Sequence, residues 1–323
     1  MNNNCALVVT YNRPSLVLRC LEALVGQKQK PDCIIIVDNG SSSDTAALLL
    51  ENGYIDKDIV STNLDRCSVR KCNKNNIAIY YILFGENQGP GYAFYYGMKF
   101  FHDLDYEWIW IMDDDGIPDN ESLVQLNNYK DKASFLNSVV IDEKNHSNLS
   151  FGFYSEEQCR LLNTKNEMLE SSDNGLIYGY AHPFNGTFIS RDLINSIGYP
   201  LFQMYGWGIE SEYLKRTKAK GFNVATVVNA NHYHPRSRVQ YTSILKGSLK
   251  LNIHKSPFIN YLSIRNSVYI GWRYHGFKRC AKLFVTYSFY YVYKLDIKGF
   301  YYFINAFVDG IFAIWGREKK LQK

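Results

Sequence analysis

Short apolar runs alternate with segments of helical periodicity along the first part of the chain. The runs that resemble buried strands cover residues 5–10, 33–37, 78–84 and 108–112. Between them, apolar residues recur at helical spacing after Pro14, and a Ser/Asp cap precedes a second apolar helix at Thr45. Buried strands that alternate with helices predict a mostly parallel sheet, and therefore an α/β fold.

The run over 108–112 ends in three consecutive carboxylates, Asp113, Asp114 and Asp115. Adjacent acids repel one another and are costly to bury without a partner, and divalent ions such as Mg²⁺ and Mn²⁺ prefer carboxylate oxygen. Strand alternation would place Asp113 and Asp115 on one side, where both reach one ion or ligand, and would point Asp114 away. A solvated acidic turn is the alternative when the triplet is considered by itself.

Polar residues also follow the other predicted strands. The carboxyl ends of parallel strands share one edge of a sheet, and ligands bind there. Asn87 and Gly89 lie just before a helix predicted to begin at Tyr92, where a glycine lets backbone N–H groups approach a phosphate or a sugar. We therefore expect a site at this edge, to which the first two strands contribute Thr10, Tyr11, Asp38 and Asn39.

A loop with Trp207 and Gly208 belongs to a second stretch in which several candidate functional residues lie close together in the sequence. It leads into a helix that carries Glu210 and Glu212 near its start. Acids in a first turn commonly only complement the helix dipole. The indole of Trp207 could stack on the apolar face of a sugar, although a core tryptophan is about as common.

The region between these motifs has a mixed pattern. Residues 52–76 are polar and irregular, 135–141 predict another strand, and 142–175, rich in Asn, Ser, Glu and Lys, predict an insertion or mobile lid. After a strand predicted over 224–228, His232 and His234 stand two positions apart in extended chain and face the same way. They could bind a metal, but such pairs are more often surface polar residues.

The composition narrows the class of protein. A chain of 323 residues can bury a large core, and its net charge of +5 permits an anionic partner such as a nucleotide diphosphate without requiring nucleic acid. The seven cysteines are an odd number with no CxxC pair, and the N-terminal residues lack the basic and apolar regions of a signal peptide. A reducing, cytoplasmic setting is therefore expected.

The order and spacing of these motifs resemble family 2 of the inverting GT-A nucleotide-sugar glycosyltransferases, in particular its bacterial galactofuranosyl- and rhamnosyltransferase-like branch. The resemblance covers roughly residues 5 to 238, and it implies a Rossmann-like GT-A fold with a mostly parallel central sheet. The segments that carry it are residues 8–14, 36–41, 87–91 with Gly97, 113–115, 184–186, 198–200 and 207–213.

The resemblance implies a role for each matching residue. Thr10, Arg13 and Asp38 would hold the base and ribose of the nucleotide, and Asp113 would contact the nucleotide sugar or the metal. Asp115 and His234 would ligate Mn²⁺ or Mg²⁺, whereas His232 falls where the family usually has an apolar residue. Other positions assigned to the nucleotide-sugar site are Tyr11, Asn39, Asn87, Gly89 and Asp114, and those assigned to the acceptor are Asn185, Trp207 and Gly208.

The catalytic base is assigned by the same resemblance. Glu210 matches the usual catalytic aspartate, but it is one methylene longer, and Ile209 replaces the acid that commonly precedes the base. Glu212 therefore stays a second candidate.

The implied activity is metal-dependent transfer of a sugar from a nucleotide-sugar donor to a hydroxyl of a growing, lipid-linked bacterial surface glycan. UDP-galactofuranose is the favoured donor and dTDP-rhamnose the second. A nucleotidyltransferase is disfavoured because no Gly-rich phosphate loop with a following Lys or Arg comes after the first strand. A non-catalytic nucleotide-sugar-binding homologue is the remaining alternative.

Aromatic and basic residues crowd the C-terminal part. Tyr261, Arg265 and Asn266 resemble the helix that commonly follows this catalytic domain, so we expect a catalytic domain over 1–240 and a helical region over 241–323. The apolar segments there, residues 281–293 and 299–315, fall short of the ~20 clean apolar residues of a membrane span. They predict helices at a membrane surface, or alternatively a face that packs on the rest of the chain or on a second copy.

Overall fold

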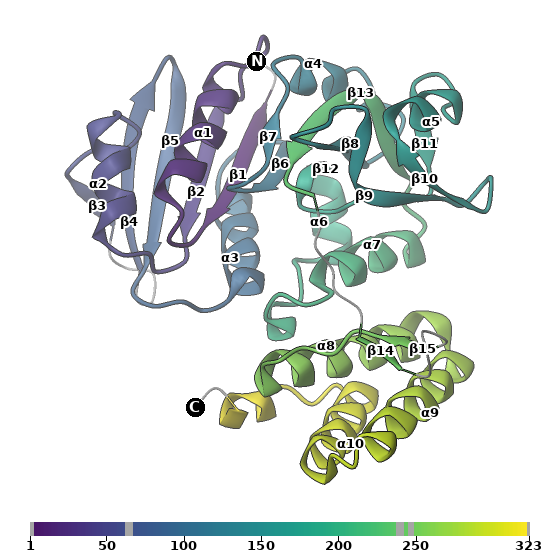
Figure 1. The fold of residues 1–323 in the computed structure, drawn as a ribbon. Coiled ribbons are helices and arrows are strands. Elements are labelled where there is room, and N and C mark those ends of the chain that lie inside the picture. The colour runs from purple at the N-terminus through teal and green to yellow at the C-terminus, as the bar shows by residue number, and fades with distance from the viewer. Residues whose placement is uncertain (1–2, 62–66, 237–241, 245–248, 322–323) are drawn as a thin grey trace. The chain divides into compact units, whose positions relative to one another are not determined.

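The computed structural model describes residues 3–61, 67–236, 242–244 and 249–321. The chain divides into two compact units, one formed by Met1–Phe202 with Arg216–Ser237 and the other by Gln203–Lys215 with Arg238–Lys323 (Figure 1). Helix α7 (Ile209–Ala219) begins in the second unit and ends in the first. The expected domain boundary, between residues 240 and 241, lies outside the described residues. The division into a catalytic domain and a C-terminal region stays a prediction.

The centre of the first unit is a run of parallel strands, as expected for this α/β fold. Their order is β6–β1–β2–β5, and all neighbouring pairs in this run are parallel. Each strand lies on one of the apolar runs of the sequence, since both faces of the sheet are covered. The bounds are Asn4–Thr10 for β1, Cys33–Asp38 for β2, Ile77–Phe84 for β5 and Trp108–Asp113 for β6.

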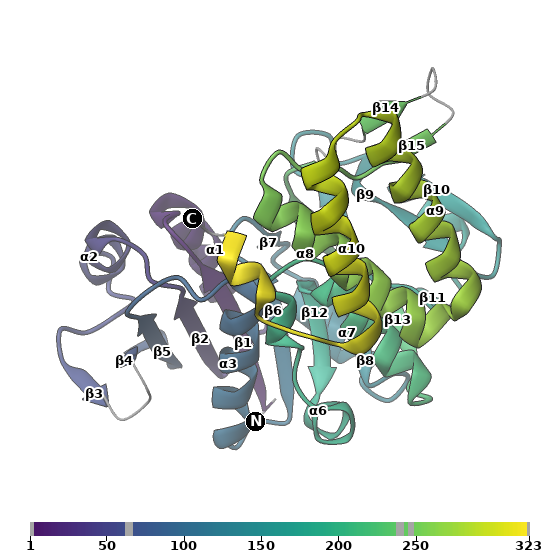
Figure 2. The ribbon, with the colours of Figure 1, turned by 90° about the horizontal axis from the view of Figure 1, so that it is seen from below.

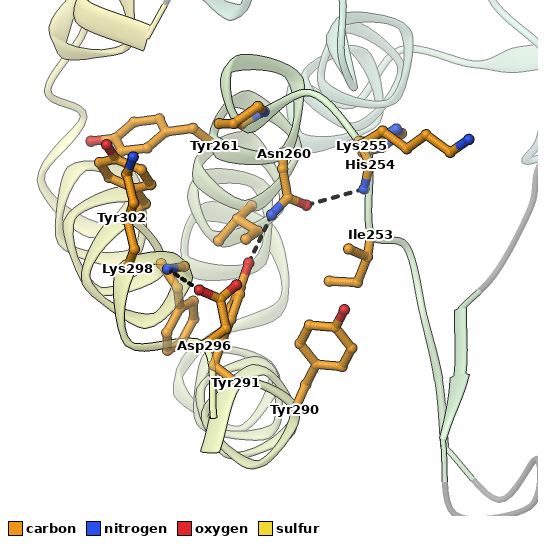
Figure 3. A pocket seen from close by; sticks show the side chains of 14 residues that line it. Ile253, His254, Lys255, Asn260, Tyr261, Tyr290, Tyr291, Asp296, Lys298 and Tyr302 are labelled. Atoms are coloured by element: carbon orange, nitrogen blue, oxygen red, sulfur yellow. Dashed lines mark hydrogen bonds between the residues drawn. The ribbon is translucent and has the colours of Figure 1, made fainter. Parts of the chain in front are cut away.

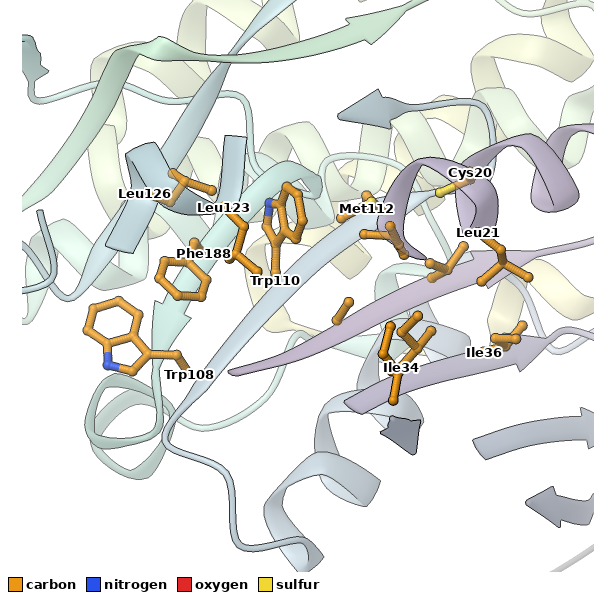
Figure 4. Packing of buried hydrophobic residues seen from close by; sticks show 14 of the residues in the cluster. Cys20, Leu21, Ile34, Ile36, Trp108, Trp110, Met112, Leu123, Leu126 and Phe188 are labelled. Carbon is orange, nitrogen blue, oxygen red and sulfur yellow. The ribbon is translucent and has the colours of Figure 1, made fainter. Parts of the chain in front are cut away.

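Helices cover the two faces of this sheet with opposite sets of strand residues. Ala6, Val8, Ile34 and Trp110 belong to a core that they share with residues of α1, α2 and α4 (Figure 4). Leu7 and its neighbours on the other face meet α3, where a Cβ at Gly97 would lie 2.5 Å from Leu7 Cδ1. Helices α1 and α3 therefore lie on opposite faces (Figure 2). The bounds are Pro14–Val25 for α1, Ser43–Glu51 for α2, Pro90–Asp103 for α3 and Ser122–Asn127 for α4.

Antiparallel strands extend the sheet on both sides and correct the expectation that residues 52–76 are irregular. The segment 52–76 contains β3 (Ile59–Ser61) and β4 (Cys67–Lys74), which extend the sheet beyond β5. The segment 142–175 forms β9, β10 and α5, and its expected role as an insertion or mobile lid stays a prediction. The remaining elements are β7 (Ile117–Pro118), β8 (Phe135–Asp142), β9 (Asn148–Ser155), β10 (Arg160–Thr164), α5 (Lys165–Glu170), β11 (Leu176–Tyr178), β12 (Asn185–Ser190), α6 (Arg191–Ile197) and β13 (Val224–His234).

The second unit is mainly helical and aromatic-rich, as expected. Helix α10 packs against both α8 and α9, and their aromatic side chains form its core. No helix among the described residues is long and apolar enough to cross a membrane. The elements are η1 (Phe202–Met204), β14 (Thr242–Ile244), β15 (Leu249–Leu251), α8 (Pro257–Ile270), the π-helix η3 (Gly271–His275), α9 (Phe277–Tyr293), α10 (Ile297–Phe312) and η4 (Arg317–Leu321).

Candidate active site

The predicted polar edge is present in the first unit. Strand β1 lies between β2 and β6, with Thr10 in register with Asp38 and Val9 in register with Asp113. The residues that follow these strands therefore gather at one edge, as the parallel order requires. On β12, Asn185 is in register with Met112, immediately before the Asp triplet.

Arg13 joins two of the three carboxylates. Its Nη1 lies 3.0 Å from Asp114 Oδ1 and 3.0 Å from Asp115 Oδ2, and the Thr10 hydroxyl donates to Asp114 Oδ2 at 2.7 Å. The expectation that Asp114 points away from Asp115 is wrong, because β6 ends at Asp113 and the chain turns there. Burial raises the pKa of Asp114 although Thr10 and Arg13 stabilise its charged form.

Asp115 also contacts His234, which arrives from the end of β13. His234 Nε2 lies 3.2 Å from Asp115 Oδ1. Burial opposes charge on both groups, but their hydrogen bond and mutual attraction prevail, so the pKa of Asp115 is lowered and the pKa of His234 is raised. The contact therefore favours the charged form of both groups.

The chemistry of this pair fits a divalent cation. His234 Nδ1 lies 2.7 Å from the Pro235 carbonyl, which only accepts hydrogen bonds, so Nδ1 carries the proton of the neutral ring and leaves Nε2 with a lone pair. Two ligands at right angles, each about 2.1 Å from an ion, lie roughly 3 Å apart, which matches the separation of Nε2 and Oδ1. Among the described residues, no group of three or more His, Cys, Asp or Glu side chains could hold a metal ion, so Asp113 as third ligand stays a prediction.

His232 differs from His234 although the sequence pattern treats them alike. Its side chain is fully buried, and burial together with the charge of His234 lowers its pKa to about 3. Neither ring nitrogen has a hydrogen-bond partner among the described residues. A Cβ at Gly116 would lie 2.0 Å from His232 Nε2, and one at Gly186 would lie 3.1 Å from the ring. Glycines at these positions thus make room for a neutral imidazole behind the Asp triplet.

The residues after β2 form a second hydrogen-bonded network. Asp38 is fully buried and accepts from the Tyr81 hydroxyl at 2.7 Å and from Ser41 N at 2.8 Å. Burial raises the pKa of Asp38 despite these hydrogen bonds. Its carboxylate therefore holds the loop after β2 in place. The sequence pattern missed Tyr81, since nothing in a buried β-strand distinguishes this tyrosine from a core residue.

Asn39 and Asn87 tie this loop to the turn before α3. The Asn39 amide donates to Asn87 Oδ1 at 3.0 Å, and the same oxygen accepts from Gly89 N at 2.8 Å. Gly89 has a φ of +84°, a conformation that glycine adopts without strain. Tyr11 is 42% exposed and is available to a ligand.

Glu210 and Glu212 lie in the second unit and have different surroundings. Glu212 is 1% exposed and accepts a hydrogen bond from the Tyr274 hydroxyl at 2.8 Å. Glu210 is partly exposed, and its carboxylate has no hydrogen bond to the side chain of another described residue. Burial raises the pKa of Glu210 to about 7.

Two buried residues of α8 hold the loop that precedes Glu210. Asn266 donates to the carbonyls of Met204 and Trp207 at 2.9 and 2.7 Å, and Arg265 donates to the Gln203 carbonyl at 2.8 Å. The Trp207 ring, 36% exposed, lies at an angle to the His254 ring with 4.4 Å between centroids. In the sequence, Arg265 and Asn266 stand out only through the family resemblance. In the structure, their hydrogen bonds give them a role, because they hold the loop that precedes Glu210.

Comparisons with known proteins identify the family of the chain. Residues 5–190 match the model of the family described as glycosyl transferase family 2. The chain is 27% identical to galactofuranosyltransferase GlfT1 of Mycolicibacterium smegmatis over 270 residues, 82% of each chain, and 25% identical to GlfT1 of Mycobacterium tuberculosis over 268 residues, 82% of this chain and 81% of the relative.

Solved structures show the same fold at low sequence identity. The structure of S. aureus TarS 1–349 in complex with UDP-GlcNAc has a TM-score of 0.58 and 15% identity, and the match covers 98% of this chain and 83% of that chain. The structure of TarS 1–349 alone gives 0.56 and 14%, over 95% and 80%. The chain belongs to glycosyl transferase family 2, has the GT-A fold and is a glycosyltransferase.

Proposed function

We propose that this glycosyltransferase moves galactofuranose from UDP-galactofuranose to a hydroxyl of a growing, lipid-linked bacterial surface glycan. The relatives named galactofuranosyltransferase, which align with 82% of the chain, support the sugar. The observation that supports the chemistry is the contact between His234 and Asp115, the last residue of the Asp triplet. dTDP-rhamnose is the second candidate donor.

The polar edge of the first unit supplies the donor site in this proposal. Asp115 and His234, with Asp113, would hold Mn²⁺ or Mg²⁺. When bound, such an ion offsets the negative charge of the departing nucleoside diphosphate as a Lewis acid. Arg13 orients Asp115 by a direct hydrogen bond, and the hydrogen bonds of Asp38, Asn39 and Asn87 fix the loops that the nucleotide would contact.

Glu210 supplies the base in this proposal. Its carboxylate removes the proton from the acceptor hydroxyl while that oxygen attacks the anomeric carbon and the bond to the diphosphate breaks on the opposite face. A carboxyl group with a pKa of about 7 is well matched to proton abstraction near neutral pH. Glu212, by contrast, is buried and accepts a hydrogen bond from the Tyr274 hydroxyl, so an acceptor would reach its carboxylate less easily, which favours Glu210.

Calorimetry of UDP and dTDP, each with and without Mn²⁺, tests the donor site. Metal-dependent UDP binding together with UDP release from UDP-galactofuranose is the expected result. Metal-independent dTDP binding would move the assignment to a rhamnosyltransferase and would remove the role of His234. Binding of neither nucleotide would contradict the proposed donor site.

A lipid-linked acceptor requires the enzyme to contact a membrane surface. The second unit has an exposed apolar face that could make this contact. Apolar side chains at the junction of α9 and α10 are exposed, among them Leu295 and Ile297 at 85% each, and Lys294 and Lys298 flank them. Exposed apolar residues beside lysines are typical of proteins that dock on anionic membranes. We therefore place the enzyme at the cytoplasmic face of the cell membrane, with a second copy of the chain as the alternative partner of this face.

A further inference from the structure

Two adjoining hollows in the second unit form a site that the transfer chemistry leaves unused. The larger, of about 230 Å³, lies among α8, the end of α9 and the start of α10 (Figure 3). The smaller, of about 140 Å³, is lined by residues of α8, α10 and η4. Tyr261 and Tyr302 line both hollows, so the two are adjacent.

The walls of the larger hollow combine aromatic rings with fixed polar groups. Asn260 donates to the Tyr291 hydroxyl at 2.7 Å and accepts from His254 N at 3.3 Å, so its amide is held in place. The hydroxyls of Tyr290 and Tyr302 have no hydrogen bond to another described residue. Aromatic faces pack on the C–H faces of a sugar, while hydroxyl and amide groups bind its hydroxyls.

The charged groups of both hollows favour an anion. Lys255 and Lys298 line the larger one against a single acid, Asp296, whose Oδ1 already caps α10 by accepting from Gly299 N at 2.8 Å. The Nζ of Lys298 lies 5.9 Å from the centre of the Tyr302 ring. The smaller hollow is lined by Lys320 and by Arg317, and none of its lining residues is acidic. Arg317 is already paired with Asp309, 3.0 Å away, so Lys320 is the cation left to an anion there.

We propose that these hollows bind a glycosyl phosphate, with the sugar on the tyrosine rings and the phosphate at the lysines. Lys298 belongs both to the site and to the exposed junction of α9 and α10, so a phosphate there lies next to the apolar residues assigned to the membrane. In the acceptor, this part would be the sugar joined to the lipid phosphate. That identification rests on the proposed function, whereas binding of a glycosyl phosphate does not.

Galactose 1-phosphate, methyl α-galactoside and inorganic phosphate separate the two halves of the ligand. Binding to the full chain is followed by calorimetry, with UDP and Mn²⁺ present so that a donor site is filled. We expect galactose 1-phosphate to bind at least tenfold more tightly than either half. Equal affinity for inorganic phosphate would reduce the hollows to an anion site and overturn the proposal, as would no binding at millimolar concentration.

Matched variants place the binding in these hollows. Lys298→Gln and Tyr302→Ala should each weaken galactose 1-phosphate binding at least tenfold, while Tyr302→Phe, which keeps the ring and loses only the hydroxyl, should weaken it less than Tyr302→Ala does. Lys294→Gln and Tyr293→Ala change neighbouring residues that line neither hollow, and should have no effect. Lys298 is exposed, so its variant keeps the test valid if Tyr302→Ala unfolds. If the wild-type protein binds galactose 1-phosphate but does not bind UDP, that result contradicts the proposed donor site and leaves the present proposal intact.

Discussion

At the scale of single residues, the assignment of the base gives a direct prediction. Glu210→Gln should lower turnover about 10²–10⁴-fold and leave UDP binding unchanged, since general base assistance contributes that much. Glu212→Gln is the matched control, because its carboxylate is buried against Tyr274. Steady-state rates and calorimetry on both variants decide the question. A larger loss of turnover in Glu212→Gln would transfer the role of base to Glu212.

The pKa of Glu210 gives a second prediction at this scale. A base must be ionised, and burial raises this pKa to about 7. Turnover at saturating substrate should therefore rise with pH up to about 7 and level off above it. A rate profile that is flat between pH 5 and pH 7 would show that a group of ordinary carboxyl pKa, or no titrating base, limits the reaction.

The Asp115–His234 pair gives a third prediction. Asp115→Asn should abolish metal-dependent UDP binding and, without metal, lower the free energy of unfolding by about 1–3 kcal/mol. The lowered pKa of Asp115 stabilises the fold above about pH 4, and the raised pKa of His234 does so below about pH 6.5. Denaturant unfolding should therefore show the largest difference from wild type between these values. A difference that persists unchanged at pH 8 would argue against an ionic pair.

At the scale of elements, α8 positions the loop before Glu210. Asn266→Ala leaves the carbonyls of Met204 and Trp207 without this donor and should cost about 1–3 kcal/mol of stability. Turnover should fall while UDP binding stays intact, because the donor residues lie in the first unit. Ser267→Ala, an exposed neighbour on the same helix, is the control. Unchanged turnover in a folded Asn266→Ala protein would mean that the loop is held by other contacts.

The elements also show where sequence patterns suffice. The buried strands β1, β2, β5 and β6 coincide with apolar runs, because parallel strands covered on both faces carry few polar residues. Strands β4 and β9 lie toward the sides of the sheet, where one face stays partly in water. Polar residues such as Arg70 and Asn148 interrupt their apolar pattern, so the sequence did not predict these strands. At the site, the polar edge followed from strand order alone, whereas the turn that brings Asp114 to Arg13 depends on where β6 ends. The apolar run predicts that end to within one residue, but strand alternation does not hold for Asp114 and Asp115, which lie beyond it.

At the scale of the whole molecule, the family match and the relatives differ in extent. The family model covers residues 5–190, whereas the alignment with GlfT1 spans 270 residues. The relatives therefore share sequence beyond the residues that match the family model, in the part of the chain where Trp207, Glu210 and the helices of the second unit are found. The second unit is therefore part of what this chain shares with these relatives, and its proposed membrane contact can be tested by itself.

Membrane contact through the α9–α10 junction predicts a specific loss of vesicle binding. Leu295 is 85% exposed and has a φ of +53°, an uncommon conformation for leucine that presents it at the tip of the turn. Replacing Leu295 and Ile297 together by serine should weaken binding to anionic vesicles in a sedimentation assay by about 10²–10⁴-fold, since burial of each side chain contributes about 1.5–3 kcal/mol. The paired control, Leu161→Ser with Leu169→Ser, removes exposed leucines of the first unit and should bind as wild type does. Equal vesicle binding by both double variants would contradict the membrane assignment. If the wild type forms a dimer that only the double variant at Leu295 and Ile297 loses, a second copy of the chain is the partner of this face.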